Sequence, residues 1–309
     1  MAPLALPGRR PTETARWIVP VALPTAAVLL VHALTAPERT GEVLRSVGVG
    51  AMWGGALIAG LVAAVLAALA VTLIRRGGGR ARRLAAAPGT WVAVGVVAYC
   101  ILLTAVASRI TPLPFFDAFE RHWQGKALDL LWVAILFAML RRWARREAGL
   151  RWTVRYGSLR PALIAIVAVA VLFIGLTVWS VALDPASRTT VGAEQFLYNG
   201  TVPNLTEEFI WRGVMLAVLD RVFGAPRKVF GAKVGWGLVI TAAVFGLGHA
   251  LLVDLETGAW GLNAAGGIFA TVMGLALGWI WARTGSLWPA FLLHCASELG
   301  VDIGMALTG

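Results

Sequence analysis

The chain has 309 residues, of which 59% are hydrophobic and only 14% charged, and its mean hydropathy is +0.77. A soluble domain carries roughly a quarter charged residues, so this composition excludes an ordinary water-soluble globular protein. The net charge is +11. Arginines cluster in short loops between apolar segments, which is typical of contact with an anionic membrane surface rather than with nucleic acid. We therefore expect an integral, multi-pass membrane protein whose partner is the lipid bilayer, with no nucleic-acid partner.

Apolar segments long enough to cross a bilayer recur along the whole chain. A helix crosses the hydrocarbon core with about 20 apolar residues. The candidate spans are residues 17–36, 47–74, 90–107, 127–140, 161–183, 204–223, 234–253, 259–282 and 287–307. The fourth is short for a span, so it is either tilted or re-entrant. We predict an all-α polytopic membrane protein with about 8–9 transmembrane helices. The two cysteines lie inside apolar segments, which excludes a disulfide framework and a CxxC metal site.

The positions of the basic residues predict an orientation. Most of the 27 lysines and arginines lie in the N-terminal tail and in every second loop. Arg9, Arg10 and Arg16 precede the first span, which lacks a signal-peptide cleavage site, so we expect an uncleaved first helix. Because basic loops stay in the cytoplasm, the N-terminus should be cytoplasmic and, with nine spans, the C-terminus external. The composition, rich in alanine and arginine, is typical of a bacterial cytoplasmic membrane protein. If the fourth segment does not cross, everything after it inverts.

Ionisable residues inside the apolar spans are the main functional signal. Each costs several kcal/mol in hydrocarbon unless it faces a partner or a water-filled cavity. The first five spans contain almost none, and His32 and Asp129 lie near span ends, within reach of the interface. The last four spans contain Glu207, Glu208, Arg212, His249, His294, Glu298 and Asp302. If these helices adjoin, the side chains converge on one cavity.

Glu208 and Arg212 are four residues apart, so on a helix they share a face and can form an ion pair. Glu207 points about 100° away from Glu208 and need not have the same role. The plain alternative is that Asn204 and Glu207 form a capping box at a helix N-terminus. That alternative leaves Arg212, further along an apolar helix, unexplained.

Two histidines follow the same spacing rule. Phe245 and His249 lie at i and i+4 of the seventh span, and His294 and Glu298 at i and i+4 of the ninth. A single histidine on an apolar helix is more often a packing residue than a catalyst. A carboxylate that holds an imidazole is, however, a functional arrangement.

These residues resemble the motifs of the CPBP family, the CAAX-processing and bacteriocin-processing intramembrane proteases. Residues 207–212 look like its EExxxR motif, and Phe245 to His249 looks like its FxxxH motif. His294 occupies the place of a family histidine that Asn or Asp follows four residues later. The resemblance covers about residues 200–305. We therefore divide the chain into N-terminal transmembrane helices of unassigned role (1–190) and a CPBP-like protease core (191–309).

The resemblance implies glutamate-dependent peptide hydrolysis within the membrane, with no cofactor and no metal. In that picture Glu207 and His249 activate a water, and Glu208 with Arg212 orients the site. His294, with the residue at 298, would stabilise the oxyanion, and Phe245 has a supporting role. Glu298 departs from the family pattern, because an ionised carboxylate repels an oxyanion that an amide would bind. Either Glu298 is protonated, or it holds His294 and leaves the oxyanion to that ring, or the protein is not proteolytic.

Three other readings stay open. Two histidines with glutamates could bind zinc in a metallopeptidase, although no HExxH pair exists. The chain could be a non-proteolytic immunity or transport protein, or its buried polar residues could only join helices. For a peptidase we expect a peptide or membrane-anchored protein as substrate. The predicted orientation places Glu207 and His249 toward the outside, which favours an exported peptide or an anchored tail over a prenylated cytoplasmic protein.

Overall fold

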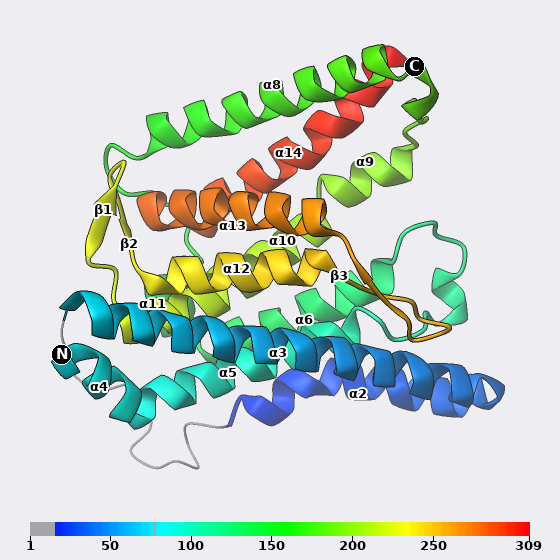
Figure 1. Ribbon diagram of the computed structural model, residues 1–309. Helices are drawn as coiled ribbons and strands as arrows, with labels where there is room; N and C mark the ends of the chain where they lie inside the picture. The colour runs from blue at the N-terminus through cyan, green and yellow to red at the C-terminus, as the bar shows by residue number, and fades with distance from the viewer. Residues whose placement is uncertain (1–15, 77) are drawn as a thin grey trace.

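The computed structural model describes residues 16–76 and 78–309, which are predominantly helical (Figure 1). The tail residues Arg9 and Arg10, used above for the orientation, lie outside these ranges. The helices long and apolar enough to cross a membrane are Ile18–Thr35, Pro37–Arg75, Pro88–Ala107, Leu159–Leu183, Ala264–Thr284 and Leu287–Thr308. The prediction of an all-α polytopic membrane protein is confirmed.

The first half of the chain forms one side of the bundle. Its helices are α2 (Ile18–Thr35), α3 (Thr40–Arg76), α4 (Gly78–Ala86), α5 (Pro88–Ala107), α6 (Trp123–Met139) and α7 (Arg141–Trp143), with η1 (Pro37–Arg39), η2 (Pro114–Phe116) and the π-helical turn η3 (Ala144–Ala148). α3 packs along α5, and α2 packs on α6. Pro88 is the first residue of α5. At this position a backbone N–H would have no acceptor within the helix, so proline, which lacks the N–H, costs no hydrogen bond.

The second half carries the candidate site. Its helices are α8 (Leu159–Leu183), η4 (Pro185–Ser187), α9 (Ala193–Asn199), α10 (Val202–Glu208), the π-helix η5 (Phe209–Leu216), α11 (Ala217–Phe223), α12 (Trp236–Ala250), α13 (Ala264–Thr284) and α14 (Leu287–Thr308). α12 packs against α13, and α14 against α8, which lies along the opposite side of the molecule from α2 (Figure 1). The predicted boundary at residue 190 falls between η4 and α9.

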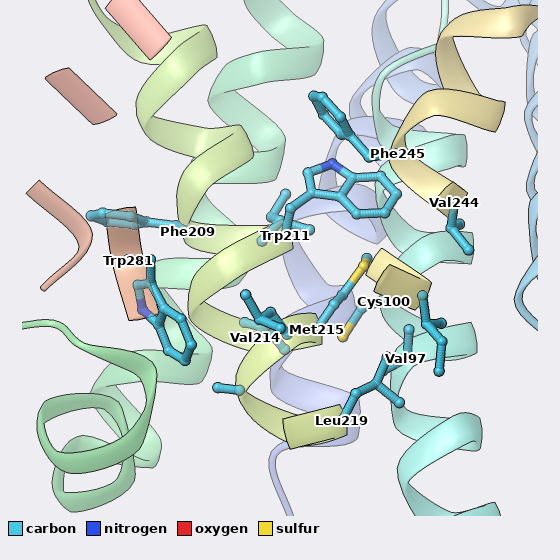
Figure 2. Close-up of a cluster of buried hydrophobic side chains, with 14 of the residues drawn as sticks. Val97, Cys100, Phe209, Trp211, Val214, Met215, Leu219, Val244, Phe245 and Trp281 are labelled. Carbon is cyan, nitrogen blue, oxygen red and sulfur yellow. The ribbon is translucent and has the colours of Figure 1, made fainter. Parts of the chain in front are cut away.

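The apolar core joins the two halves around η5. Met215 and Leu219 lie near Val97 and Cys100 of α5 in one cluster of buried side chains (Figure 2). Both Met215 and Leu219 have an exposed fraction of 0%. The site helix is therefore held on one side by the helices of the first half of the chain.

Three predicted spans differ from the helices found. The fourth, predicted at 127–140, is the longer helix α6 of 17 residues. The span predicted at 234–253 is the shorter helix α12 of 15 residues, and the span predicted at 204–223 contains the π-helix η5. The predicted spans 234–253 and 259–282 are wrong at the ends that face each other. There the chain forms the antiparallel strands β3 (Leu251–Val253) and β4 (Trp260–Leu262), with Leu251 opposite Leu262. Hydropathy does not distinguish an apolar strand from an apolar helix, which explains the error.

The helices end at two opposite ends of the molecule. One of them, the basic end, contains the arginines of α4, α7 and η3, and the other end is less basic. At the basic end, Arg80 of α4 donates to the carbonyl of Phe223, and Arg221 pairs with Glu147. A second hairpin, β1 (Arg227–Val229) with β2 (Ala232–Val234), lies at this end. Phe230 at its tip has a φ of 44°, a left-handed conformation that is rare for a bulky residue. The β3–β4 hairpin and α9 lie at the other end (Figure 1).

Candidate functional site

The site is built around a fully buried carboxylate, that of Glu208. Its Oε1 accepts a hydrogen bond from Nη1 of Arg212 at 2.7 Å and lies 2.9 Å from Nδ1 of His294 on α14. The exposed fractions of the Glu208 and Arg212 side chains are 0% and 3%. An isolated charge at this depth would be strongly unfavourable, so the two opposite charges depend on each other. Glu208 thus ties α10 to α14.

Glu208 is the last residue of α10, and Arg212 lies about one turn further along, in η5. α10 starts at Val202, so Asn204 lies inside it, and its Nδ2 donates to the carbonyl of Asn199 at 2.6 Å. The capping box of Asn204 and Glu207 is therefore not formed. The π-helix η5 begins directly after Glu208. Such wide turns occur frequently at functional sites.

Phe245 joins the two histidines and the arginine. Its ring centroid lies 4.5 Å from that of His249 and 6.4 Å from that of His294. The guanidinium carbon of Arg212 lies 4.8 Å from the same ring. Phe245 also meets Trp211 edge-on, with the ring centroids 5.2 Å apart. Figure 2 shows these two rings next to each other. The aromatic ring at this position fixes the spacing of three ionisable side chains.

In each of the two histidines, Nδ1 is the ring nitrogen that has a hydrogen-bond partner within the described part of the protein. Nδ1 of His249 lies 2.9 Å from the carbonyl oxygen of Phe245. A carbonyl can only accept, so Nδ1 carries the hydrogen. Nδ1 of His294 lies against the ion-paired carboxylate of Glu208, which likewise acts as an acceptor. In both rings Nε2 is then the nitrogen left to act on a substrate or a water.

Glu207 has a partner that the sequence analysis missed. Nζ of Lys126, in the first turn of α6, donates to its Oε1 at 2.6 Å, and each side chain has an exposed fraction of 20%. Glu207 and Glu208 thus have different ionic partners in the structure. Lys126 directly precedes the segment predicted as the fourth span, so it was not among the ionisable residues found within spans. Nothing in one sequence indicates which carboxylate such a lysine will meet.

Glu298 does not hold the imidazole of His294. Its Oε1 lies 3.8 Å from Nε2 of His294, too far for a hydrogen bond, and its side chain has an exposed fraction of 40%. The anchor of His294 is Glu208 instead. One helical turn further, Asp302 accepts hydrogen bonds from Gln195 at 2.6 Å and Asn199 at 2.8 Å, so it fastens α9 to α14.

The prediction for the surroundings of Asp129 is also wrong. We expected it to reach the membrane interface, but its exposed fraction is 1%. It accepts hydrogen bonds from Thr104 of α5 and from the indole of Trp132, both at 2.7 Å. His32 is also buried, and its Nε2 lies 2.8 Å from the carbonyl of Thr111. Both side chains therefore connect segments within the first half of the chain.

No group of three or more His, Cys, Asp and Glu side chains within residues 16–76 and 78–309 is arranged to hold a metal ion. The site instead consists of two pairs of opposite charges, Glu208 with Arg212 and Glu207 with Lys126, and two anchored imidazoles. Such a set can accept a proton from water and donate hydrogen bonds to a developing negative charge.

Comparison with known proteins agrees with the three motifs. Residues 189–300 match the family model described as Type II CAAX prenyl endopeptidase Rce1-like. The two ion pairs and the two anchored imidazoles, except for Lys126, lie within the matched segment. No curated protein and no solved structure matches the chain.

Proposed function

We propose that this membrane protein, whose residues 189–300 form an Rce1-like CAAX endopeptidase domain, hydrolyses a peptide bond with a water activated by Glu207. The observation that carries the proposal is that the Nδ1-anchored imidazoles of His249 and His294 lie around Phe245, both close enough to Glu207 for charge interaction with its carboxylate. The substrate is a membrane-associated or exported peptide, or the tail of a membrane-anchored protein.

Glu207 acts as the general base. Among the described residues only Lys126 hydrogen-bonds this carboxylate, through Oε1, so Oε2 is left for a water. Nε2 of His249 accepts the second hydrogen of that water and orients it. As the water oxygen attacks the scissile carbonyl carbon, its proton passes to Glu207. When the C–N bond breaks, the same proton passes to the leaving amine.

His294 stabilises the oxyanion of the tetrahedral intermediate. With Nδ1 bound to Glu208, a protonated ring donates from Nε2 to the oxyanion. Glu208, which is paired with Arg212, anchors this ring, and Oε1 of Glu298 lies 3.8 Å from Nε2. In this proposal the oxyanion is bound by the ring of His294, and Glu298 does not donate to it.

The test is the Glu207→Gln variant in proteoliposomes with a library of lipid-anchored peptides. Loss of a general base should lower the cleavage rate by at least about 100-fold. Peptide binding, measured separately, should persist. Glu256→Gln on the exposed β3–β4 turn is the matched control and should cleave at the wild-type rate. Cleavage by Glu207→Gln at the wild-type rate would exclude the mechanism.

The same proteoliposomes distinguish the proposal from two alternative functions. A zinc peptidase would lose its activity in EDTA and regain it with zinc, whereas the proposed mechanism is insensitive to the chelator. A peptide-binding immunity protein or a transporter would keep its function in the Glu207→Gln variant and show no cleavage in the wild type.

A further inference from the structure

A small cavity opens at the basic end, remote from the proposed catalytic residues. It has a volume of about 150 Å³ and lies between the end of α3, α4, the end of α11, the β1–β2 hairpin and the start of α12. Its walls are mainly apolar and include Val71, Leu84, Phe223, Trp236, Leu238 and Val239. None of the residues that we assign to catalysis lines it.

Three arginines line the same cavity: Arg75 at the end of α3, Arg80 on α4 and Arg227 on β1. Arg80 is held in place, because its Nη2 donates to the carbonyl of Phe223 at 3.2 Å. Arg75 and Arg227 are exposed. No carboxylate lines the cavity, and within the described part of the chain none of the three guanidinium groups forms an ion pair.

The other polar groups in the wall already have partners. The indole N–H of Trp236 donates to Thr72 Oγ1 at 3.0 Å, and the Thr72 hydroxyl donates to the carbonyl of Ala68 at 2.7 Å. The guanidinium groups are therefore the groups in this cavity with hydrogen-bonding capacity left. Arginine binds phosphate oxygens in a two-pronged geometry, so a phosphate group is the partner that suits them best.

The location indicates where that phosphate comes from. The cavity lies among the basic helix ends, and α4 carries the further exposed residues Arg82 and Arg83. Basic pockets between membrane helices bind anionic lipid headgroups. An apolar wall next to a phosphate site fits a molecule that has an acyl chain as well as a headgroup. A free phosphate ion would leave that wall without a contact.

We propose that the cavity lined by Arg75, Arg80 and Arg227 binds an anionic glycerophospholipid, with its phosphate on the guanidinium groups and the start of an acyl chain against the apolar wall. The bound lipid would join α3, α4 and α12 across the basic end. This site is independent of the peptidase activity, so it can be tested whether or not the protein cleaves peptides.

The test compares lipid binding in nanodiscs, read by native mass spectrometry. The wild type should retain phosphatidylglycerol and not phosphatidylcholine. The double variant Arg75→Gln/Arg227→Gln should bind phosphatidylglycerol about 30-fold more weakly. The double variant Arg82→Gln/Arg146→Gln loses the same charge from exposed positions at the basic end that do not line the cavity, and should bind like the wild type.

Three results would overturn the proposal. The first is equal phosphatidylglycerol binding by the cavity variant and the wild type at the same melting temperature. The second is equal retention of phosphatidylcholine. The third is displacement of the lipid by millimolar inorganic phosphate, which would identify a small-anion site. Arg75 and Arg227 are exposed, so neither change is expected to prevent folding.

Discussion

At the scale of single residues, the site consists of pairs of side chains, some within one helix and some between helices. Glu208 with Arg212, and Phe245 with His249, are four residues apart and meet in the structure. Helical spacing predicted both of these pairs but failed for His294 and Glu298, which lie too far apart for a hydrogen bond. The imidazole is held instead by Glu208, from another helix, through Nδ1. Spacing along one helix contains no information on partners from other helices. The same limit explains why Lys126, 81 positions before Glu207, was missed.

The pair of Lys126 and Glu207 should be energetically coupled. Removal of either charge leaves the other partly buried without its partner, whereas removal of both does not. In a double-mutant cycle of Lys126→Met and Glu207→Gln we expect a coupling free energy of about 1–3 kcal/mol. Unfolding in detergent by SDS titration provides the measurement. Additive single effects would show that the ion pair contributes nothing to the stability of the site.

Lys126→Arg tests whether the lysine acts on catalysis through Glu207. Lys126→Met removes the charge and should lower the cleavage rate. The longer side chain of Lys126→Arg keeps the positive charge, so this variant should recover most of that rate. If both variants are equally inactive while their stability matches the wild type, the exact placement of the ammonium group is required, not only its charge.

At the scale of elements, hydropathy located the long helices well and their ends less well. The spans predicted at 17–36 and 90–107 agree within two residues with α2 and α5. The apolar strands β3 and β4 were assigned to helices, since composition alone does not separate the two. The π-helix η5 leaves no mark in the hydropathy pattern.

Close packing of α14 on α8 depends on Gly300 and Gly304. A Cβ at Gly304 would lie 2.6 Å from Cβ of Thr177, and one at Gly300 would lie 2.8 Å from Cβ of Phe173. Small residues four apart let membrane helices approach closely. Gly304→Leu should therefore lower the unfolding free energy by about 1–3 kcal/mol.

The matched control is Gly175→Leu on α8, where an added Cβ meets nothing within 4 Å. Both changes replace a helical glycine with the same good helix former, so any difference between them isolates packing. Equal stability of the two variants in SDS titration would contradict the role of Gly304.

α9 is attached to the start of α6 and the loop before it by the carboxylate of Glu194 and by Arg121, whose guanidinium donates to Gln195 at 2.6 Å. Glu194 accepts hydrogen bonds from the indole of Trp123 at 2.9 Å and from the backbone of Arg121 at 3.0 Å and Glu120 at 3.2 Å. Desolvation raises the pKa of Glu194, but these hydrogen bonds outweigh it, so the pKa lies below the ordinary value. The stabilisation is then present above about pH 4.3 and is lost as the pH falls through the folded-state pKa.

Amide exchange of residues 193–199, corrected for the intrinsic effect of pH, should therefore rise on acidification. In Glu194→Gln the exchange should be fast at every pH. The control is Glu120→Gln. The side chain of Glu120 is exposed and only its backbone N–H contacts Glu194, so this variant should keep the pH dependence of the wild type. An unchanged acid response in Glu194→Gln would assign it to another group.

At the scale of the whole molecule, the distribution of charge predicts the orientation in the membrane. α14 starts at the basic end, where the N–H of Leu287 donates to the carbonyl of Gly149, and finishes at the opposite end. Lys126 in the first turn of α6 and His249 in the last turn of α12 also lie toward the less basic end. If the basic end faces the cytoplasm, the proposed base and its partner lie in the outer half of the bilayer.

A reporter fused after Gly309 should therefore be external, whereas one fused after Ala87, in the basic loop before α5, should be cytoplasmic. Alkaline phosphatase activity at the first position and green fluorescence at the second would support this orientation. An external site fits an exported peptide or an anchored tail, because a prenylated cytoplasmic protein could not reach it from its own side. A cytoplasmic reporter after Gly309 would reverse the orientation, and with it the choice of substrate, while leaving the geometry of Glu207, His249 and His294 intact.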